Sequence, residues 1–157
     1  MGAIRQFIED VKWGNLDYLV VDLPPGTGDE PLSIVQLIPK ADGAIIITTP
    51  QDVSLLDSRK TVTFARQANI PVLGIVENMS GMVCPHCNQI VDVFKSGGGE
   101  KTAIDMDVDF LGRVPMEPEV VLSGDDGRPV VMSRPDSEAA RAFMRIVDAV
   151  RKKVEKS

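Results

Sequence analysis

Short, continuously apolar runs alternate with amphipathic stretches along most of this chain. The runs at residues 18–22, 44–48 and 72–77 are rich in β-branched residues and end at glycine, proline or polar turn residues, and a less regular run follows at residues 110–114. A strand that is apolar on both faces needs cover on both faces, as in a parallel sheet between two layers of helices. The alternation therefore predicts a doubly wound, mostly parallel α/β sheet, with functional residues in the loops that follow the strands' carboxyl ends.

Apolar residues at helical spacing fill the gaps between these runs. They predict helices at residues 3–12, 30–37, 54–69, 101–106 and 137–154, the last with Asp136 as its N-cap. In the last helix, acidic residues dilute the basic face, so we interpret it as a core-packing helix and not as a membrane-binding one. The chain has 157 residues, of which 43% are hydrophobic and 25% charged, so we expect a single domain over residues 1–157.

Charge and apolar-run length exclude several kinds of partner. Seventeen basic and 23 acidic side chains give a formal net charge of -6, which disfavours binding to the phosphate backbone of nucleic acids. No apolar run approaches the roughly 20 residues of a membrane-spanning helix, and the first residues do not resemble a secretory signal. We therefore expect a cytoplasmic protein with neither nucleic acid nor membrane as partner.

The strand–helix rhythm breaks at an insertion covering about residues 79–96, which is expected to turn back through residues 89–93 as a small hairpin. It carries the only two cysteines of the chain, Cys84 and Cys87, at a spacing typical of metal or redox chemistry. A tetrahedral zinc or a four-iron cluster takes four protein ligands, and a symmetric dimer would supply two such pairs. Two other interpretations stay open, a redox pair and an inert surface turn, although redox pairs usually begin a helix.

A polar residue ends one of the predicted strands, and another polar residue directly follows a second one. Asp22 ends the run at residues 18–22 and precedes a Pro-Pro-Gly turn, an arrangement that suits a carboxylate holding Mg²⁺ beside a phosphate-contacting loop at Gly26. Asn78 follows the run at residues 72–77, and its amide could pair with the edge of an adenine. The alternatives are ordinary turn roles, because both Asp and Asn are frequent turn formers.

A glycine-rich segment at residues 97–102 superficially resembles a phosphate-binding Walker A loop. Its spacing does not fit that motif, and Glu100 before Lys101 would repel a phosphate. We interpret the segment as a flexible loop that leads into a short helix.

Four segments together resemble the Mrp-type iron-sulfur carriers, which are MinD-like P-loop ATPases. They are residues 16–29, 49–52, 77–80 and 84–87, which read LDYLVVDLPPGTGD, TPQD, ENMS and CPHC. The likeness runs from about Ile4 to the final helix. It implies a homodimer that binds ATP and Mg²⁺, and that carries a labile cluster, most simply 4Fe-4S, between the cysteine pairs of two subunits for delivery to apo iron-sulfur proteins. Zinc could take the place of the cluster.

The resemblance also assigns roles to individual positions. Cys84 and Cys87 match the cluster ligands, Asp22 the magnesium-site aspartate, Gly26 the phosphate-sensing loop, Asn78 the adenine contact and Pro115 a stretch that lines the base pocket.

One part of the family pattern has no counterpart among these residues. It is the deviant Walker A loop, in which two lysines frame the glycines. We therefore expect a partial P-loop NTPase domain whose sheet is incomplete at the N-terminus, and no ATP hydrolysis by this chain alone.

Two alternative functions remain. In one, the cysteine pairs staple a structural or regulatory dimer with zinc, without any dependence on nucleotide. In the other, the chain is related to partition or septum-site ATPases that bind membranes or filaments, which the mixed charge of the final helix disfavours.

Overall fold

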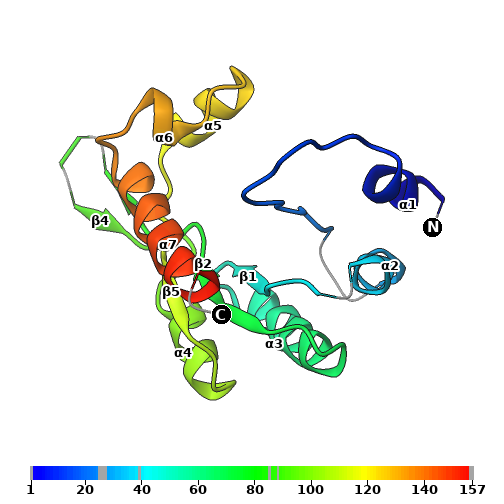
Figure 1. Cartoon of the computed structure of the whole chain (residues 1–157). Coiled ribbons are helices and arrows are strands. Elements are labelled where there is room, and N and C mark those ends of the chain that lie inside the picture. Colours follow the sequence, from blue (N-terminus) through cyan, green and yellow to red (C-terminus); the bar gives the residue numbers. More distant parts are fainter. Residues whose placement is uncertain (1, 25–27, 39, 85, 88, 156–157) are drawn as a thin grey trace.

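A three-stranded parallel sheet forms the centre of the fold in the computed structural model, which describes residues 2–24, 28–38, 40–84, 86–87 and 89–155. The strand order is β1-β2-β5, where β1 is Ala44–Thr48, β2 is Val72–Glu77 and β5 is Phe110–Arg113 (Figure 1). The sequence places these three strands within one residue of their observed ends, because each is a mostly apolar run bounded by turn residues. The α/β class is confirmed.

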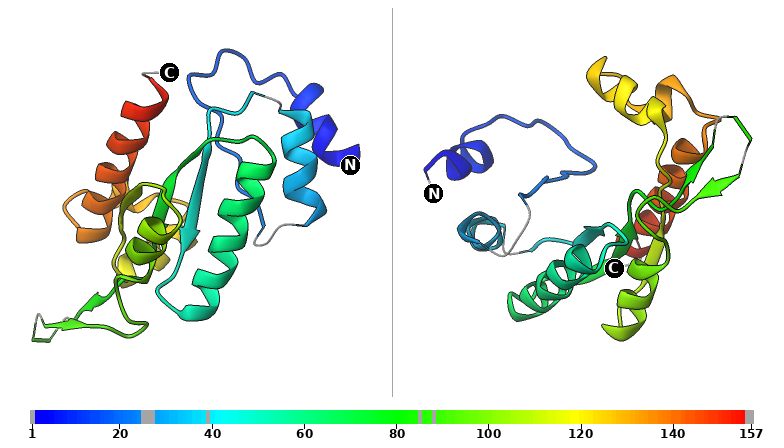
Figure 2. Two further views of the ribbon diagram at one scale, coloured as in Figure 1. Left: turned by 90° about the horizontal axis from the view of Figure 1, so that it is seen from below. Right: turned by 180° about the vertical axis from the view of Figure 1, so that it is seen from behind.

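Helices cover both faces of this sheet. Helices α3 (Asp52–Gln67) and α4 (Gly98–Asp105) lie on one face and α7 (Glu138–Val154) lies on the other (Figures 1 and 2). Successive residues of β2 point to opposite faces, as the strand period requires. Ile75 is therefore buried in a cluster with residues of α3 and α4, and Val76 is buried in a second cluster with residues of α7.

The remaining elements lie outside this layered core. They are α1 (Gly2–Glu9), α2 (Asp29–Leu37), β3 (Met82–Val83), β4 (Ile90–Val91), α5 (Pro118–Asp125) and α6 (Val130–Ser133). Strands β3 and β4 form an antiparallel hairpin that projects away from the sheet (Figure 2). The sequence does not predict α5 and α6, because they are short and interrupted by Gly, Asp and Pro, which weaken the helical period.

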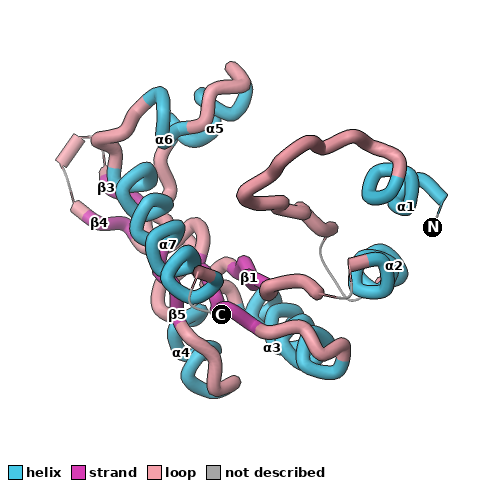
Figure 3. Tube along the Cα trace, viewed as in Figure 1, coloured by secondary structure: helices cyan, strands magenta, loops and turns pink. Residues whose placement is uncertain are grey.

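The strand predicted at residues 18–22 is wrong. These residues lie in the long loop that joins α1 to α2 (Figure 3), and no strand among the described residues pairs with them. A strand needs a hydrogen-bonding neighbour, and the apolar run shows only that its side chains favour burial. That burial is not reached, since Val20 is 89% exposed. The loop is tied to the end of α7 by the hydroxyl of Tyr18, which donates to Glu155 Oε1 at 2.6 Å.

The final helix begins one residue later than predicted. Ser137, and not Asp136, is its N-cap, and the Ser137 hydroxyl oxygen accepts the N–H of Ala140 at 3.1 Å. Both residue types cap helices well, so the sequence could not choose between neighbouring candidates. The predicted core-packing role of α7 is confirmed, because a stripe of small residues and Ile146 are buried against the sheet. None of the helices in the described part of the chain is long and apolar enough to cross a membrane.

The two-sided core gives a stability prediction. Ile75 is fully buried between β2 and the helices α3 and α4, so Ile75→Ala should lower the free energy of unfolding by about 2–5 kcal/mol. The matched control is Ile45→Ala on β1, whose side chain is 41% exposed and which should cost clearly less. Urea unfolding followed by circular dichroism measures both. Equal losses for the two variants would contradict this account of the core.

Candidate functional site

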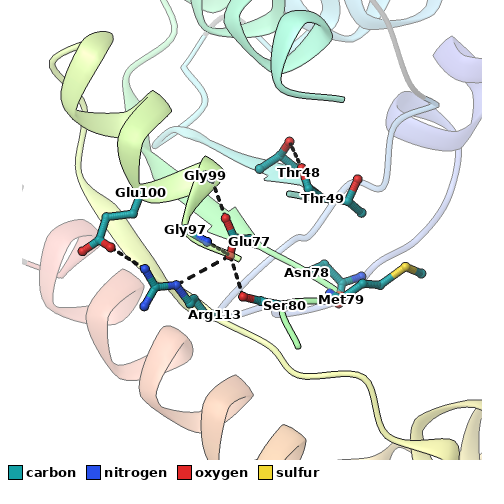
Figure 4. Close-up of polar contacts among 10 residues, drawn as sticks. All are labelled: Thr48, Thr49, Glu77, Asn78, Met79, Ser80, Gly97, Gly99, Glu100 and Arg113. Carbon is teal, nitrogen blue, oxygen red and sulfur yellow. Dashed lines mark hydrogen bonds and ion pairs between the residues drawn. The ribbon is translucent and has the colours of Figure 1, made fainter. Parts of the chain in front are cut away.

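The carboxyl ends of the three parallel strands meet at one edge of the sheet. The backbone N–H of Asn78 donates to the carbonyl of Thr48 at 2.7 Å, and the N–H of Val114 donates to the carbonyl of Glu77 at 2.8 Å. The strand pairing therefore continues into the loops that follow β1, β2 and β5, and it brings these loops together (Figure 4). This is the edge at which open parallel sheets bind their ligands.

A buried carboxylate, that of Glu77, occupies the middle of this edge. Its side chain is fully buried. Oε1 accepts the hydroxyl of Ser80 at 2.5 Å and the N–H of Gly97 at 2.9 Å, and Oε2 accepts the N–H of Gly99 at 2.5 Å. The guanidinium Nε of Arg113 lies 3.6 Å from Oε1 (Figure 4). These donors offset the cost of removing a carboxylate from water.

The glycine-rich segment is built to reach this carboxylate. Gly97 adopts a left-handed conformation with φ of +84°, and the next two glycines form the first turn of α4. A Cβ on Gly99 would lie 2.9 Å from Cβ of Glu77, so only glycine lets the backbone N–H approach so closely. The predicted short helix is therefore observed, but it begins at Gly98, earlier than the expected residue 101, and the N–H groups at its start bind an internal carboxylate. This agrees with the interpretation that it is no Walker A loop.

Two of the sequence-predicted nucleotide contacts lie at this edge. Asn78 is half-buried directly after β2, and its side-chain oxygen accepts the N–H of Met79 at 2.9 Å, which holds the amide in the turn. Pro115 is half-buried after β5, the neighbouring strand. Asp22 lies elsewhere, with an exposed side chain in the loop between α1 and α2, outside the sheet. Gly26 falls outside the described residues.

The cysteine pair sits at the turn of the β3–β4 hairpin. The hairpin begins beside the sheet edge, where the N–H of Met116 donates to the carbonyl of Gly81 at 2.8 Å. Its far end is closed by the N–H of Cys84, which donates to the carbonyl of Gln89 at 2.9 Å. Both cysteines are free thiols; Cys84 is half-buried and Cys87 is exposed. The hairpin-like excursion expected from the sequence is thus observed.

The local backbone favours the thiolate form of Cys84. The N–H of His86 and, to a lesser extent, that of Cys87 hydrogen-bond to its sulfur and lower the pKa of the Cys84 thiol. The thiolate is the form that binds metals and reacts as a nucleophile. In the described part of the chain no three His, Cys, Asp or Glu side chains gather into a metal-binding group. The pair therefore offers two of the four ligands that a tetrahedral site takes.

Comparison with known proteins places this geometry in a family. Residues 1–151 match the family described as ParA: NUBPL iron-transfer P-loop NTPase. The chain is 54% identical over 154 residues to an iron-sulfur cluster carrier protein of Methanocaldococcus jannaschii, covering 98% of this chain and 52% of that protein. It is 48% identical over 153 residues to the carrier protein of Saccharolobus solfataricus, again covering 98% and 52%. The chain thus spans about half the length of these relatives.

Solved structures agree with this placement. A nucleotide-binding protein from Archaeoglobus fulgidus, solved in complex with ADP, superposes with a TM-score of 0.71 at 41% identity, covering 81% of this chain and 52% of that one. The cell division ATPase MinD of Pyrococcus furiosus superposes with a TM-score of 0.69 at 23% identity, covering 87% and 52%, and shows a shared fold. Fold and cysteine hairpin together define a P-loop NTPase-like α/β protein that presents a Cys-x-x-Cys pair. The chain belongs to the NUBPL iron-transfer P-loop NTPase family, and the resemblance to iron-sulfur carriers is confirmed.

The sequence predicts site roles for Cys84, Cys87 and Asn78, which stay predictions, but it assigns no role to Glu77. Glu77 entered the sequence analysis as the last residue of an apolar strand and as part of the segment ENMS, without a role of its own. Two features could have signalled its role. A charged residue ends an otherwise apolar, buried run, and three consecutive glycines follow further along the chain.

The lowered pKa of Cys84 predicts its reactivity. Because the thiolate persists to lower pH, alkylation of Cys84 by iodoacetamide should reach half its maximal rate below the ordinary cysteine pKa of about 8.5. Peptide mass spectrometry across a pH series on the reduced, metal-free protein measures this. The control is the same series in concentrated urea, where the hairpin backbone is lost and the midpoint should rise. An identical midpoint in both conditions would show that the folded backbone does not favour the thiolate.

Proposed function

We propose that this chain binds an iron-sulfur cluster through Cys84 and Cys87 and passes it to apo iron-sulfur proteins, as part of a nucleotide-dependent carrier. The observation that carries the proposal is the presentation of two free thiols at the turn of a hairpin that projects from the sheet. A site in this position is reachable by an acceptor protein, whereas a buried site would retain its cluster. The family match and the relatives named as cluster carriers support the same conclusion.

The number of ligands points to a dimer. A four-iron cluster takes four thiolates, and this chain has two cysteines. Two copies related by a two-fold axis would bring two hairpin turns together and complete a 4Fe-4S site. We therefore propose a homodimer that shares its cargo between subunits. Zinc, which also accepts four thiolates, could replace the cluster.

The nucleotide part of the proposal concerns the sheet edge. We propose that residues 1–157 are part of a single MinD-like P-loop NTPase domain in which Asn78 and Pro115 contact adenine. Their common position at the carboxyl edge of β2 and β5 supports this, as does the relative solved with ADP. Asp22 would hold Mg²⁺ and Gly26 would contact the terminal phosphate. Bound nucleotide would supply phosphoryl-transfer energy to the whole carrier. The carrier would work in the cytoplasm, where reducing conditions keep the cysteines as thiols.

A second candidate function is a dimer stapled by zinc, without transfer of iron. The same two free thiols favour it, because tetrathiolate zinc sites are structural in many proteins. The two functions differ in the metal retained and in whether it can be handed on.

Cluster reconstitution tests the proposal directly. Incubated anaerobically with iron and sulfide, the reduced chain should form a dimer that holds iron and sulfide in a ratio near one to one, with visible absorption by the cluster. Cys84→Ala and Cys87→Ala should each abolish it, because removing one thiolate per subunit leaves two of four ligands. His86→Ala is the matched control: it changes the exposed side chain between the cysteines and should leave the cluster in place.

The measurements are iron, sulfide and zinc content per chain and mass by light scattering, followed by transfer to an apo-ferredoxin. Retention of zinc alone, with no iron and no transfer, would replace the carrier with the zinc-stapled dimer. An iron-free monomer would remove both functions.

Nucleotide recognition can be tested separately. If the Asn78 amide reads adenine, the chain should bind ADP more tightly than GDP, and Asn78→Ala should reduce that preference by roughly tenfold, the worth of one or two hydrogen bonds. Isothermal titration calorimetry with both nucleotides gives the ratio. GDP serves as the matched control ligand, because the two nucleotides differ only in the base. Equal affinity for the two nucleotides, or none for ADP, would contradict the adenine role of Asn78.

A further inference from the structure

We propose that Glu77 is a positioning residue for the cluster site: its buried carboxylate clamps the two ends of the cysteine excursion together and so sets where Cys84 and Cys87 project. This inference rests on the proposed cluster-binding function. Glu77 does not contact the cargo, and it acts through the backbone that carries the cysteines.

Both ends of the excursion are bound by one atom. Ser80 lies where the chain leaves the edge of the sheet, and Gly97 lies where it returns to begin α4. The Ser80 hydroxyl and the Gly97 N–H both donate to Oε1 of Glu77, at 2.5 and 2.9 Å. Figure 4 shows both donors at this oxygen. The excursion that carries both cysteines is therefore closed on a single carboxylate oxygen.

The carboxylate is itself fixed from two other elements. Oε2 accepts the N–H of Gly99 in the first turn of α4, at 2.5 Å. From β5, Arg113 places its Nε 3.6 Å from Oε1, pairs with Glu100 and lies over the ring of Phe110. A fully buried side chain with partners in α4 and β5 has little freedom to reorient, which makes it a rigid base for the excursion.

The β3–β4 hairpin depends on this anchoring at its two ends, because few contacts within the hairpin stabilise it. Strands β3 and β4 pair over only two residues each, and two-stranded hairpins are marginally stable in water. Its apolar side chains are largely exposed; Ile90, for example, is 75% exposed. A cluster shared by two copies requires both cysteine pairs to meet in a fixed geometry, and loosening the base would lower their effective concentration toward each other.

Two substitutions disturb the carboxylate in different ways. Glu77→Gln keeps the shape of the side chain but replaces one carboxylate oxygen with an amide NH₂ group. Whichever oxygen is replaced, the NH₂ group then faces the N–H of Gly97 or that of Gly99, and the hydrogen bond there is lost. Gly99→Ala leaves the charge intact and introduces a Cβ 2.9 Å from Cβ of Glu77 and 3.1 Å from Oε2. The matched control is Gly124→Ala in α5, where a Cβ would meet nothing within 4 Å.

Two measurements are made on each folded variant. The first is hydrogen exchange of the Cys84 amide in the metal-free protein, since this N–H reports closure of the hairpin through its bond to Gln89. The second is the rate at which a chelator removes iron from the reconstituted dimer, followed by its visible absorption. Both rates should rise about tenfold or more in Glu77→Gln and Gly99→Ala, as expected from the loss of a charge-assisted hydrogen bond. Gly124→Ala should match the unchanged chain.

The results distinguish a failure of the Glu77 clamp from a failure of the proposed cluster binding. Unchanged exchange and unchanged iron loss in both variants would overturn the clamp. If the unchanged chain takes up no cluster, the proposed function fails and the role of Glu77 in cluster retention fails with it, while the exchange rates still show whether the carboxylate fixes the hairpin. Should Glu77→Gln not fold, Ser80→Ala decides, because it removes only one hydroxyl from Oε1 and should still speed both processes severalfold.

Discussion

The buried carboxylate of Glu77 is the interaction on which the arrangement of the site depends. Burying a charge at the end of a central strand is costly unless hydrogen bonds and an opposite charge replace the lost water. Here the replacements come from the Ser80 hydroxyl, the glycine N–H groups at the start of α4 and the guanidinium of Arg113. Satisfying one carboxylate thus fixes the geometry of the excursion, the first turn of a helix and the end of β5 together.

The sequence predicts well what depends on local pattern and poorly what depends on distant partners. The strands β1 and β2 were predicted at their observed bounds, because runs such as AIIIT and VLGIVE suit burial on both faces. Residues 18–22 have the same character, yet they lie in a loop, since apolar composition does not specify a neighbouring strand. Asp136 was not the cap of α7, because Ser137 beside it is equally suitable and its hydroxyl oxygen accepts the N–H of Ala140.

In the candidate site, too, some residues are indicated by local sequence pattern and others depend on contacts with distant residues. Cys84 and Cys87 could be proposed from the sequence because their spacing is typical of metal or redox sites, and Asn78 because it follows a strand directly. The partners of Glu77 could not be predicted, because Gly97 and Gly99 come from beyond the excursion and meet the carboxylate only when the chain folds back. For Asp22, the sequence predicts a carboxylate at the sheet edge, whereas in the structure its segment lies outside the sheet.

The two proposed sites share one short piece of backbone. Asn78, which would contact the base, directly follows Glu77, which clamps the cysteine excursion, and its N–H is bonded to Thr48 of the next strand. Coupling between sites requires an element whose position both ligands influence. The end of β2 is the element that carries both residues, because Asn78 directly follows Glu77 and the Glu77 carboxylate is hydrogen-bonded to Ser80 and Gly99. Communication between nucleotide and cluster would then need no long pathway, only the displacement of two consecutive residues.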